Sequence, residues 1–204
     1  PKRFARFRTA VRLAALLHDI GHGPLSHTTE FAMPDVRELK VPGTTSASTS
    51  ASGKGAKLSR QATHEDYTLK IILDSGLTPM LMDAGKFHGF KPLHVAGLVD
   101  PGLEIRDDFF IETVDGERID YRPILQQLIS SELDADRMDY LRRDSVNAGV
   151  SYGQFDFDWL VGSLTSYVKG GKCYLALHHR ALYSFEDFLI SRFHMFLMVY
   201  FHYK

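Results

Sequence analysis

Two groups of side chains that could do chemistry stand out in the sequence, and the first lies near its start. His18 and Asp19 are adjacent at the end of a predicted helix over residues 8–20, just before glycines interrupt the helical pattern. A neutral imidazole beside a carboxylate supplies half of a divalent-metal site. The pair by itself leaves two interpretations open, a metal-ligand pair or an ordinary packed histidine.

The second group is a run of carboxylates in the later part of a predicted helix over residues 122–143 and just past its end. Its members are Glu132, Asp134, Asp136, Asp139 and Asp144. At helical spacing Asp136, Tyr140 and Asp144 share one face, and Arg137 lies at its border. That face offers a metal-capable carboxylate, an aromatic platform and a second carboxylate. Charge alone favours a plainer interpretation, a solvated face whose carboxylates pair with neighbouring arginines.

Hydrophobic spacing predicts the elements that must position these groups. The helix over 8–20 carries its apolar stripe at Leu13, Leu16, Leu17 and Ile20. Further helices are predicted from about Ser26, over 64–73, over 122–143 and from Ser184 to the end, with a hairpin over 109–121 and two strands over 167–177. The predicted class is mainly α with a minor β-hairpin element.

Residues 42–57 are a low-complexity stretch of small and polar residues without a large apolar side chain. Such a composition has nothing to bury, so it predicts a mobile loop. Because it joins His27 to His64, we expect it to lie over the site as a lid.

Composition excludes several classes of protein. The 204 residues carry a formal charge of −1, which argues against a globally basic nucleic-acid binder. The single Cys173 excludes an intramolecular disulfide and favours a reducing, cytoplasmic location. No secretory signal is visible, and the apolar stretch over 185–201 carries charges that a membrane span would rarely tolerate, so we expect a soluble protein.

Two motifs together carry a resemblance to a known family. The run His-Asp-Ile-Gly-His-Gly-Pro-Leu-Ser-His over 18–27 is followed far downstream by Asp-Ala-Asp-Arg-Met-Asp-Tyr over 134–140. In this combination the chain resembles the HD-domain phosphohydrolase superfamily, and within it the deoxynucleoside triphosphate triphosphohydrolases, the branch of the SAM-and-HD-domain enzymes and their bacterial relatives. The resemblance implies an HD-domain helical core, with residues 1–204 as a single domain that is truncated at both ends.

The resemblance also implies the roles of individual residues. His18, Asp19 and Asp136 match three ligands of one divalent metal ion (Mn, Mg, Fe, Ni or Zn), whereas the family's upstream histidine ligand has no counterpart. His27 matches the catalytic histidine with Glu30 as its carboxylate partner, and His22 and His64 match histidines aimed at the phosphates. The positions matched to substrate binding are Arg137, Tyr140, Asp144, Arg192 and Tyr200.

The activity implied is hydrolysis of a deoxynucleoside triphosphate to deoxynucleoside and inorganic triphosphate, performed by a homo-oligomer. A divalent cation suits this chemistry because it lowers the pKa of water and neutralises phosphate charge. Two alternatives stay open, another HD-type phosphohydrolase such as a nucleotidase, and a non-hydrolytic nucleotide sensor or nucleic-acid-binding module. The basic residues near the start are more often a solvated face than a nucleic-acid site.

Overall fold

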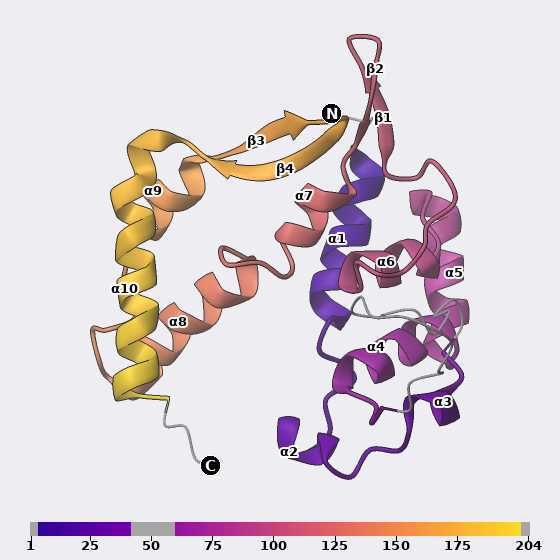
Figure 1. Cartoon of the computed structure of the whole chain (residues 1–204), viewed down its shortest axis with the longest axis horizontal. Coiled ribbons are helices and arrows are strands. Elements are labelled where there is room, and N and C mark those ends of the chain that lie inside the picture. Colours follow the sequence, from indigo (N-terminus) through magenta and orange to yellow (C-terminus); the bar gives the residue numbers. More distant parts are fainter. Residues whose placement is uncertain (1–3, 42–59, 201–204) are drawn as a thin grey trace, which may run out of the picture. The chain divides into compact units, whose positions relative to one another are not determined.

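The computed structural model describes residues 4–41 and 60–200, and the chain divides into two compact units (Figure 1). The first unit is Pro1–Phe110 and the second is Ile111–Lys204. Each is described by itself, and the single domain expected over 1–204 stays a prediction. The expected class is confirmed, since the elements are mainly helices with one small sheet. The loop predicted over 42–57 lies outside the described residues.

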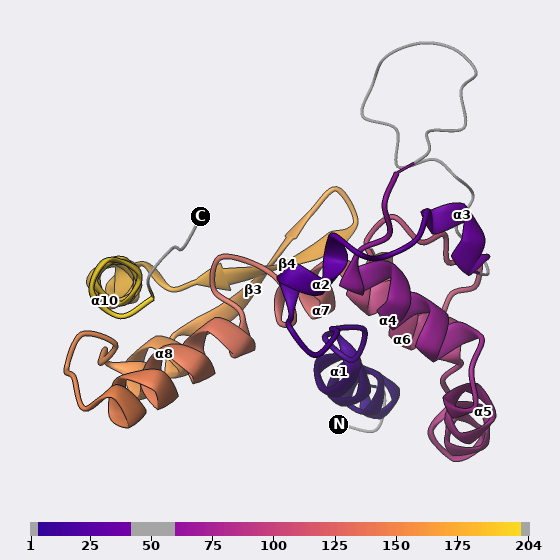
Figure 2. The ribbon, with the colours of Figure 1, turned by 90° about the horizontal axis from the view of Figure 1, so that it is seen from below.

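In its described residues the first unit consists of helices, with one isolated β-bridge between Asp35 and Gln61. Its elements are α1 (Ala5–Leu17), α2 (His27–Glu30), α3 (Val36–Leu39), α4 (His64–Leu73), α5 (Leu77–His88) and α6 (Pro92–Val99). The short helix α6 is buried along most of its length, and α1, α4 and α5 pack against it (Figures 1 and 2). The packing around α6 therefore holds together the helices that carry the first predicted group of site residues.

A buried histidine closes this core. His94 in α6 is 3% exposed, stacks on the Phe109 ring at 3.8 Å and bonds through Nε2 to Asp107 at 3.0 Å. Burial lowers the pKa of His94, although Asp107 opposes the shift. Burial would raise the pKa of Asp107, but hydrogen bonds from Lys91 and His94 outweigh it and lower that pKa to about 2. Both groups are consequently held in their high-pH forms, a neutral imidazole and a carboxylate.

The first helix is confirmed with different bounds and a different buried stripe. It ends at Leu17 rather than residue 20, and it buries Phe7, Ala10, Ala14 and Leu17. Of the predicted stripe, Leu16 is 75% and Ile20 43% exposed. Small alanines allow neighbouring backbones to approach closely, so the contact face follows them rather than every leucine.

The helix over 64–73 is confirmed with the bounds predicted, and α2 confirms the short helix after Ser26. Two helices, α5 and α6, were not predicted from the sequence. Helix α5 contains a proline and a glycine, which usually indicate a break in a helical pattern. Pro79 is tolerated because it occupies the third position of the helix, where a backbone N–H would have no helical partner in any case. The eight residues of α6 are buried on most sides and show too little periodicity to be recognised.

The second unit contains the sheet. Its elements are β1 (Ile111–Val114), β2 (Glu117–Asp120), α7 (Arg122–Gln127), α8 (Ala135–Ala148), α9 (Phe157–Gly162), β3 (Leu164–Lys169), β4 (Lys172–Leu177), the 3₁₀ turn η1 (His179–Ala181) and α10 (Leu182–Met198). Strand order is β1-β2-β4-β3, with both hairpins antiparallel. Both predicted hairpins are confirmed, each turning at residues with positive φ, Asp115–Gly116 and Gly170–Gly171.

The single helix predicted over 122–143 is wrong, because the structure has α7 and α8 with a turn between them. Asp134 causes the new start: its carboxylate accepts from the backbone N–H of Ser131 at 2.9 Å and of Arg137 at 2.7 Å. The bond from Arg137 is N-capping, which satisfies a donor that the helix start leaves without a partner, and the bond from Ser131 holds the preceding turn. The helix then continues to Ala148 and ends at Gly149 in the left-handed conformation.

The final helix is confirmed in part. It begins at Leu182 and ends at Met198, so Val199 and Tyr200 lie beyond it rather than inside it. Its buried face contributes Phe188 and Met195 to a core with Met138, Leu141 and Leu160. Within the described residues, no helix has the length and apolar character required to cross a membrane.

Candidate functional site

The predicted metal pair lies where α1 ends. The His18 ring donates from Nδ1 to the carbonyl oxygen of Ala15 at 2.8 Å, and its Nε2 lies 3.3 Å from Oδ2 of Asp19. With Nδ1 protonated, Nε2 keeps its lone pair, which is the form in which an imidazole binds a metal. The donor set of these two residues therefore fits a divalent cation.

Thr68 of α4 ties this pair to the rest of the first unit. Its fully buried hydroxyl donates to the carbonyl oxygen of His18 and accepts from the N–H of Gly21, each at 3.0 Å. The first bond satisfies a carbonyl group that the end of α1 leaves without a helical partner, and the second satisfies a donor of the turn that follows. A β-carbon at Gly21 would lie 2.0 Å from the carbonyl oxygen of His64, so only glycine lets the two segments approach this closely.

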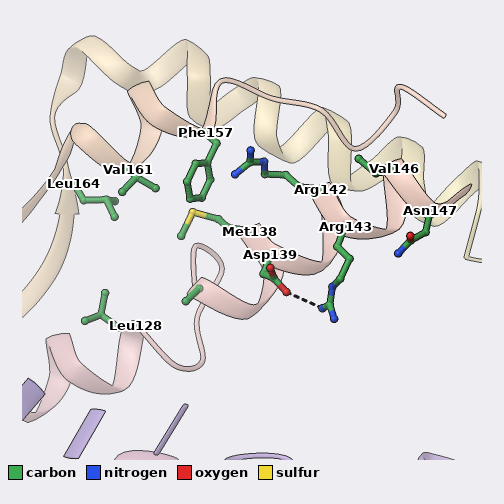
Figure 3. A pocket seen from close by; sticks show the side chains of 11 residues that line it. Leu128, Met138, Asp139, Arg142, Arg143, Val146, Asn147, Phe157, Val161 and Leu164 are labelled. Carbon is green, nitrogen blue, oxygen red and sulfur yellow. Dashed lines mark ion pairs between the residues drawn. The ribbon is translucent and has the colours of Figure 1, made fainter. Parts of the chain in front are cut away.

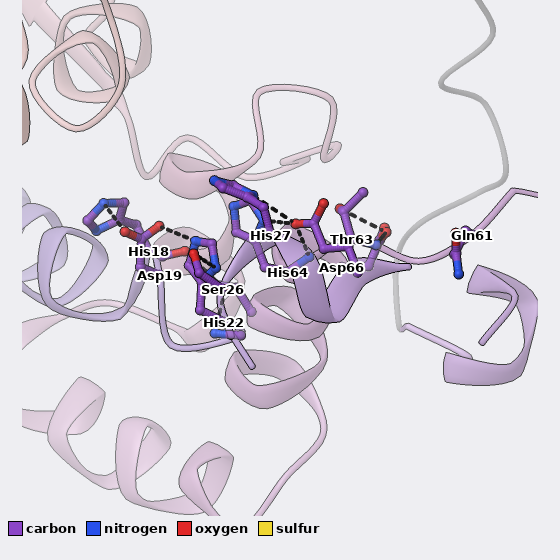
Figure 4. Close-up of polar contacts among 12 residues, drawn as sticks. His18, Asp19, His22, Ser26, His27, Gln61, Thr63, His64 and Asp66 are labelled. Carbon is purple, nitrogen blue, oxygen red and sulfur yellow. Dashed lines mark hydrogen bonds and ion pairs between the residues drawn. The ribbon is translucent and has the colours of Figure 1, made fainter. Parts of the chain in front are cut away.

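Three histidine rings meet beside the pair (Figure 4). His22 and His64 stack at 3.8 Å between ring centroids, and His27 lies edge-on to them at 4.9 and 5.1 Å. One ligand atom from each lies within 4.8 Å of the others, a grouping that could hold a metal ion. The resemblance implied phosphate contact for His22 and His64 and acid catalysis for His27, so a shared ion is a feature that only the structure indicates.

Glu30 links two of the three rings. Its Oε1 accepts from Nδ1 of His27 at 3.3 Å, from Nδ1 of His64, and from the backbone N–H of His64 at 3.3 Å. The hydrogen bond from the His64 ring is the main cause that lowers the pKa of Glu30 to about 2. The carboxylate is thus ionised at neutral pH, and each Nδ1–H points at it.

His22 is controlled by its surroundings as well. Its side chain is 21% exposed, and burial, followed by the nearby His64, lowers its pKa. Its ring also lies 3.4 Å from the Ser26 hydroxyl and 3.7 Å from Oδ1 of Asp19. A lowered pKa keeps this imidazole neutral and able to accept a hydrogen bond or bind a metal.

The second unit brings together the residues predicted to bind substrate. The Tyr200 hydroxyl donates to Oδ2 of Asp144 at 2.6 Å, and its ring lies edge-on to Tyr140 at 6.1 Å. Burial raises the pKa of both tyrosines, so they stay neutral hydrogen-bond donors at neutral pH. Tyr140, Asp144 and Asp136 follow one another at i, i+4 spacing along α8, as predicted.

Both predicted phosphate-binding arginines contact one carboxylate. Arg137 and Arg192 donate to Oε2 of Glu132 at 2.9 and 2.8 Å. Glu132 is 71% exposed, so an anionic ligand could replace it between the two guanidinium groups. In the sequence Glu132 stood out only as a member of the carboxylate run, since nothing local relates it to an arginine 60 residues away.

A separate cavity of about 640 Å³ lies along α8 (Figure 3). Met138, Phe157 and Val161 line it, together with the ion-paired Asp139 and Arg143. None of the predicted site residues lines this cavity.

The predicted site residues thus form two groups, one in each unit. His18, Asp19, His22, His27, Glu30 and His64 belong to the first, and Asp136, Arg137, Tyr140, Asp144, Arg192 and Tyr200 to the second. That Asp136 shares one ion with His18 and Asp19 stays a prediction, because each unit is described by itself.

Comparison with known proteins agrees with the motifs. The HD domain family model matches residues 2–144. The chain is 30% identical over 190 residues to the uncharacterized protein YwfO of Bacillus subtilis, covering 93% of this chain and 32% of that protein. It is 28% identical over 193 residues to the uncharacterized MG461 homolog of Mycoplasma pneumoniae, and the match covers 95% of this chain and 37% of that protein. For the uncharacterized protein MJ1154 of Methanocaldococcus jannaschii the identity is 26% over 191 residues, with coverage of 94% and 30%.

The chain therefore spans about a third of the length of these relatives. The family model, in contrast, covers well over half of the chain and includes both of the motifs that suggested it. We conclude that the chain belongs to the HD domain family.

Proposed function

We propose that this chain is the catalytic part of a hydrolase that cleaves deoxynucleoside triphosphates into deoxynucleoside and inorganic triphosphate. The observation that carries the proposal is the Glu30 carboxylate, which accepts hydrogen bonds from the rings of both His27 and His64. A carboxylate-oriented histidine at the edge of a site is the arrangement that general acid catalysis requires.

His18 and Asp19 would hold the divalent cation, together with Asp136 if the two units supply one site. When bound, the cation supplies charge neutralisation on the phosphates and a water of lowered pKa.

His27 is the proposed proton donor. Its side chain is 71% exposed, so its Nε2 is accessible to a substrate while Nδ1–H stays directed at Glu30. In the reaction, a water oxygen bonds to the α-phosphorus as the bond from that phosphorus to the 5′-oxygen breaks. His27 in its imidazolium form gives its Nε2 proton to the departing 5′-oxygen, and the attacking water loses one proton to bulk solvent.

The remaining residues are proposed to bind the substrate. His22 and His64 are stacked side by side and present ring nitrogens that suit phosphate oxygens. Arg137 and Arg192 converge on one carboxylate and would converge in the same way on a phosphate. Tyr140 would pack against the sugar ring and disfavour a 2′-hydroxyl, and Asp144 would accept a hydrogen bond from the 3′-hydroxyl.

The test is incubation of the protein with each deoxynucleoside triphosphate and Mn²⁺ or Mg²⁺, followed by chromatography of the products. Inorganic triphosphate supports the proposal, whereas orthophosphate indicates a nucleotidase and no product indicates a sensor. In ¹⁸O-water, label in triphosphate supports attack at phosphorus, and label in the nucleoside 5′-hydroxyl contradicts it.

His27→Ala should lower turnover by about 10²–10⁴, the usual contribution of a general acid, without loss of the metal. His88→Ala, at an exposed histidine at the end of α5, is the matched control and should leave turnover unchanged.

A further inference from the structure

The three histidines have a second use that follows from their donor atoms. They come from three segments, the turn after α1, the start of α2 and the start of α4, yet their ligand atoms lie within 4.8 Å of one another. Three imidazole nitrogens around one ion, with a solvent-filled fourth position, is a common coordination set for Zn²⁺. A zinc–nitrogen bond of about 2.0–2.1 Å requires the nitrogens to approach to about 3.4 Å. The His22 and His64 rings are stacked with an angle of 13° between their planes, so one ring must rotate before the in-plane lone pairs of both can meet at one ion.

The hydrogen bonds of Glu30 prepare two of the rings for this role. Since His27 and His64 both donate from Nδ1 to its carboxylate, the neutral rings keep their lone pairs on Nε2. A histidine ligand whose other nitrogen donates to a carboxylate is the usual arrangement around protein-bound metals, because it sets the tautomer and raises basicity.

The backbone also holds His27 toward the other rings. Ser26, immediately before it, has φ 52° and ψ −132°, a conformation that costs a non-glycine residue about 1–3 kcal/mol. Strain of this kind persists where surrounding structure requires it. Here the Ser26 conformation turns the chain so that the His27 ring lies edge-on to the rings of His22 and His64.

We propose that His22, His27 and His64 form a cation site distinct from the His18–Asp19 pair, which takes a borderline transition-metal ion such as Zn²⁺ or Co²⁺. All three donors are imidazole nitrogens, which suit these ions, whereas Mg²⁺ and Ca²⁺ prefer oxygen ligands. Because His27 is 71% exposed, the ion is accessible from solvent and keeps an open position.

Occupation of this site regulates the reaction, a consequence that rests on the proposed function. An ion on Nε2 of His27 removes the proton donor, and the same ion removes His22 and His64 from phosphate contact. Zn²⁺ therefore inhibits turnover that Mn²⁺ or Mg²⁺ supports, in competition with the substrate.

The test uses Co²⁺, whose visible absorption reports four-coordinate binding and requires no activity. The 204-residue chain should take up Co²⁺ with such a spectrum, and Zn²⁺ should displace it. His27→Ala and His64→Ala should each weaken Co²⁺ binding at least tenfold, and Glu30→Gln should weaken it about 10–100-fold, as loss of a supporting hydrogen bond does. His88→Ala and His18→Ala are the controls, and both should keep the spectrum.

His64 is only 16% exposed, so its variant is checked by circular dichroism, while the exposed His27 can be replaced without disturbing the fold. Absence of the four-coordinate spectrum overturns the proposal, and so does a spectrum that survives His27→Ala but is lost in His18→Ala. A chain that binds Co²⁺ but hydrolyses nothing supports the site and contradicts the proposed function. A chain that hydrolyses deoxynucleoside triphosphates but binds no Co²⁺ supports the proposed function and contradicts the cation site.

Discussion

Replacing Gly21 by alanine tests whether the close contact between the end of α1 and α4 positions the candidate site. An added β-carbon would lie 2.0 Å from the carbonyl oxygen of His64 and 2.5 Å from the backbone nitrogen of Thr68. Ordinary contact begins near 3.4 Å, so the start of α4 must retreat by about 1.4 Å. Both neighbours are backbone atoms, which cannot rotate aside as a flexible side chain can.

The energetic cost follows from two contributions. Overpacking of this kind costs about 1–3 kcal/mol. Displacing α4 also weakens the hydrogen bond from the N–H of Gly21 to the Thr68 hydroxyl, worth about 0.5–1.5 kcal/mol. We therefore expect Gly21→Ala to lower the free energy of unfolding by about 1.5–4.5 kcal/mol.

Gly76 provides the matched control in the same unit. It has φ −62° and ψ −18°, which alanine adopts without strain, and a β-carbon there would meet nothing within 4 Å. Gly76→Ala should be neutral or stabilising by up to about 1 kcal/mol, because alanine restricts the unfolded chain.

The assay is urea unfolding of the two variants and the unmodified chain at one temperature, followed by circular dichroism. Activity gives a second readout, since displacement of His64 by about 1 Å should lower turnover by about 10²-fold. If Gly21→Ala and Gly76→Ala unfold within about 0.5 kcal/mol of each other, the inferred contact between α1 and α4 is wrong.

Three further predictions concern groups that the structure pairs. Thr68→Val removes both hydrogen bonds of a fully buried hydroxyl and should cost about 2–4 kcal/mol in urea unfolding; a loss below about 1 kcal/mol would contradict the pairing. Asp107 and His94 both have pKa values below those of the unfolded chain, so their stabilisation is present at neutral pH. For His94 it begins to be lost below about pH 6.5, and for Asp107 it is lost between about pH 4 and about pH 2. Asp107→Asn should therefore flatten the dependence of the urea midpoint on pH below 4, and an unchanged slope would refute this assignment. Tyr200→Phe removes the hydrogen bond to Asp144 and should cost about 1–2 kcal/mol by the same assay, whereas no change would show that the bond contributes nothing.

Features that depend on a few consecutive residues were predictable. The helix over 64–73 has the bounds expected because Thr63 and Asp66 form a capping box at its start. The two hairpins follow from Asp115–Gly116 and Gly170–Gly171, which adopt the positive φ that tight turns require. The start of α8 also has a local signal, because an aspartate before a helical run is typical of an N-cap, although the sequence analysis predicted one continuous helix across it.

The candidate site, like the fold, was predictable only in part from the sequence. The sequence by itself determined the family, because the His-Asp motif and the distant aspartate motif are specific combinations of residues in a set order. It also determined the residue types available for metal and phosphate contact. Only the tertiary structure showed that Glu30 bonds to a histidine 34 residues away, and that Thr68 joins α4 to the end of α1. The physical reason is that turns and caps are stabilised within a few residues of chain, whereas these contacts exist only once separate helices pack around α6.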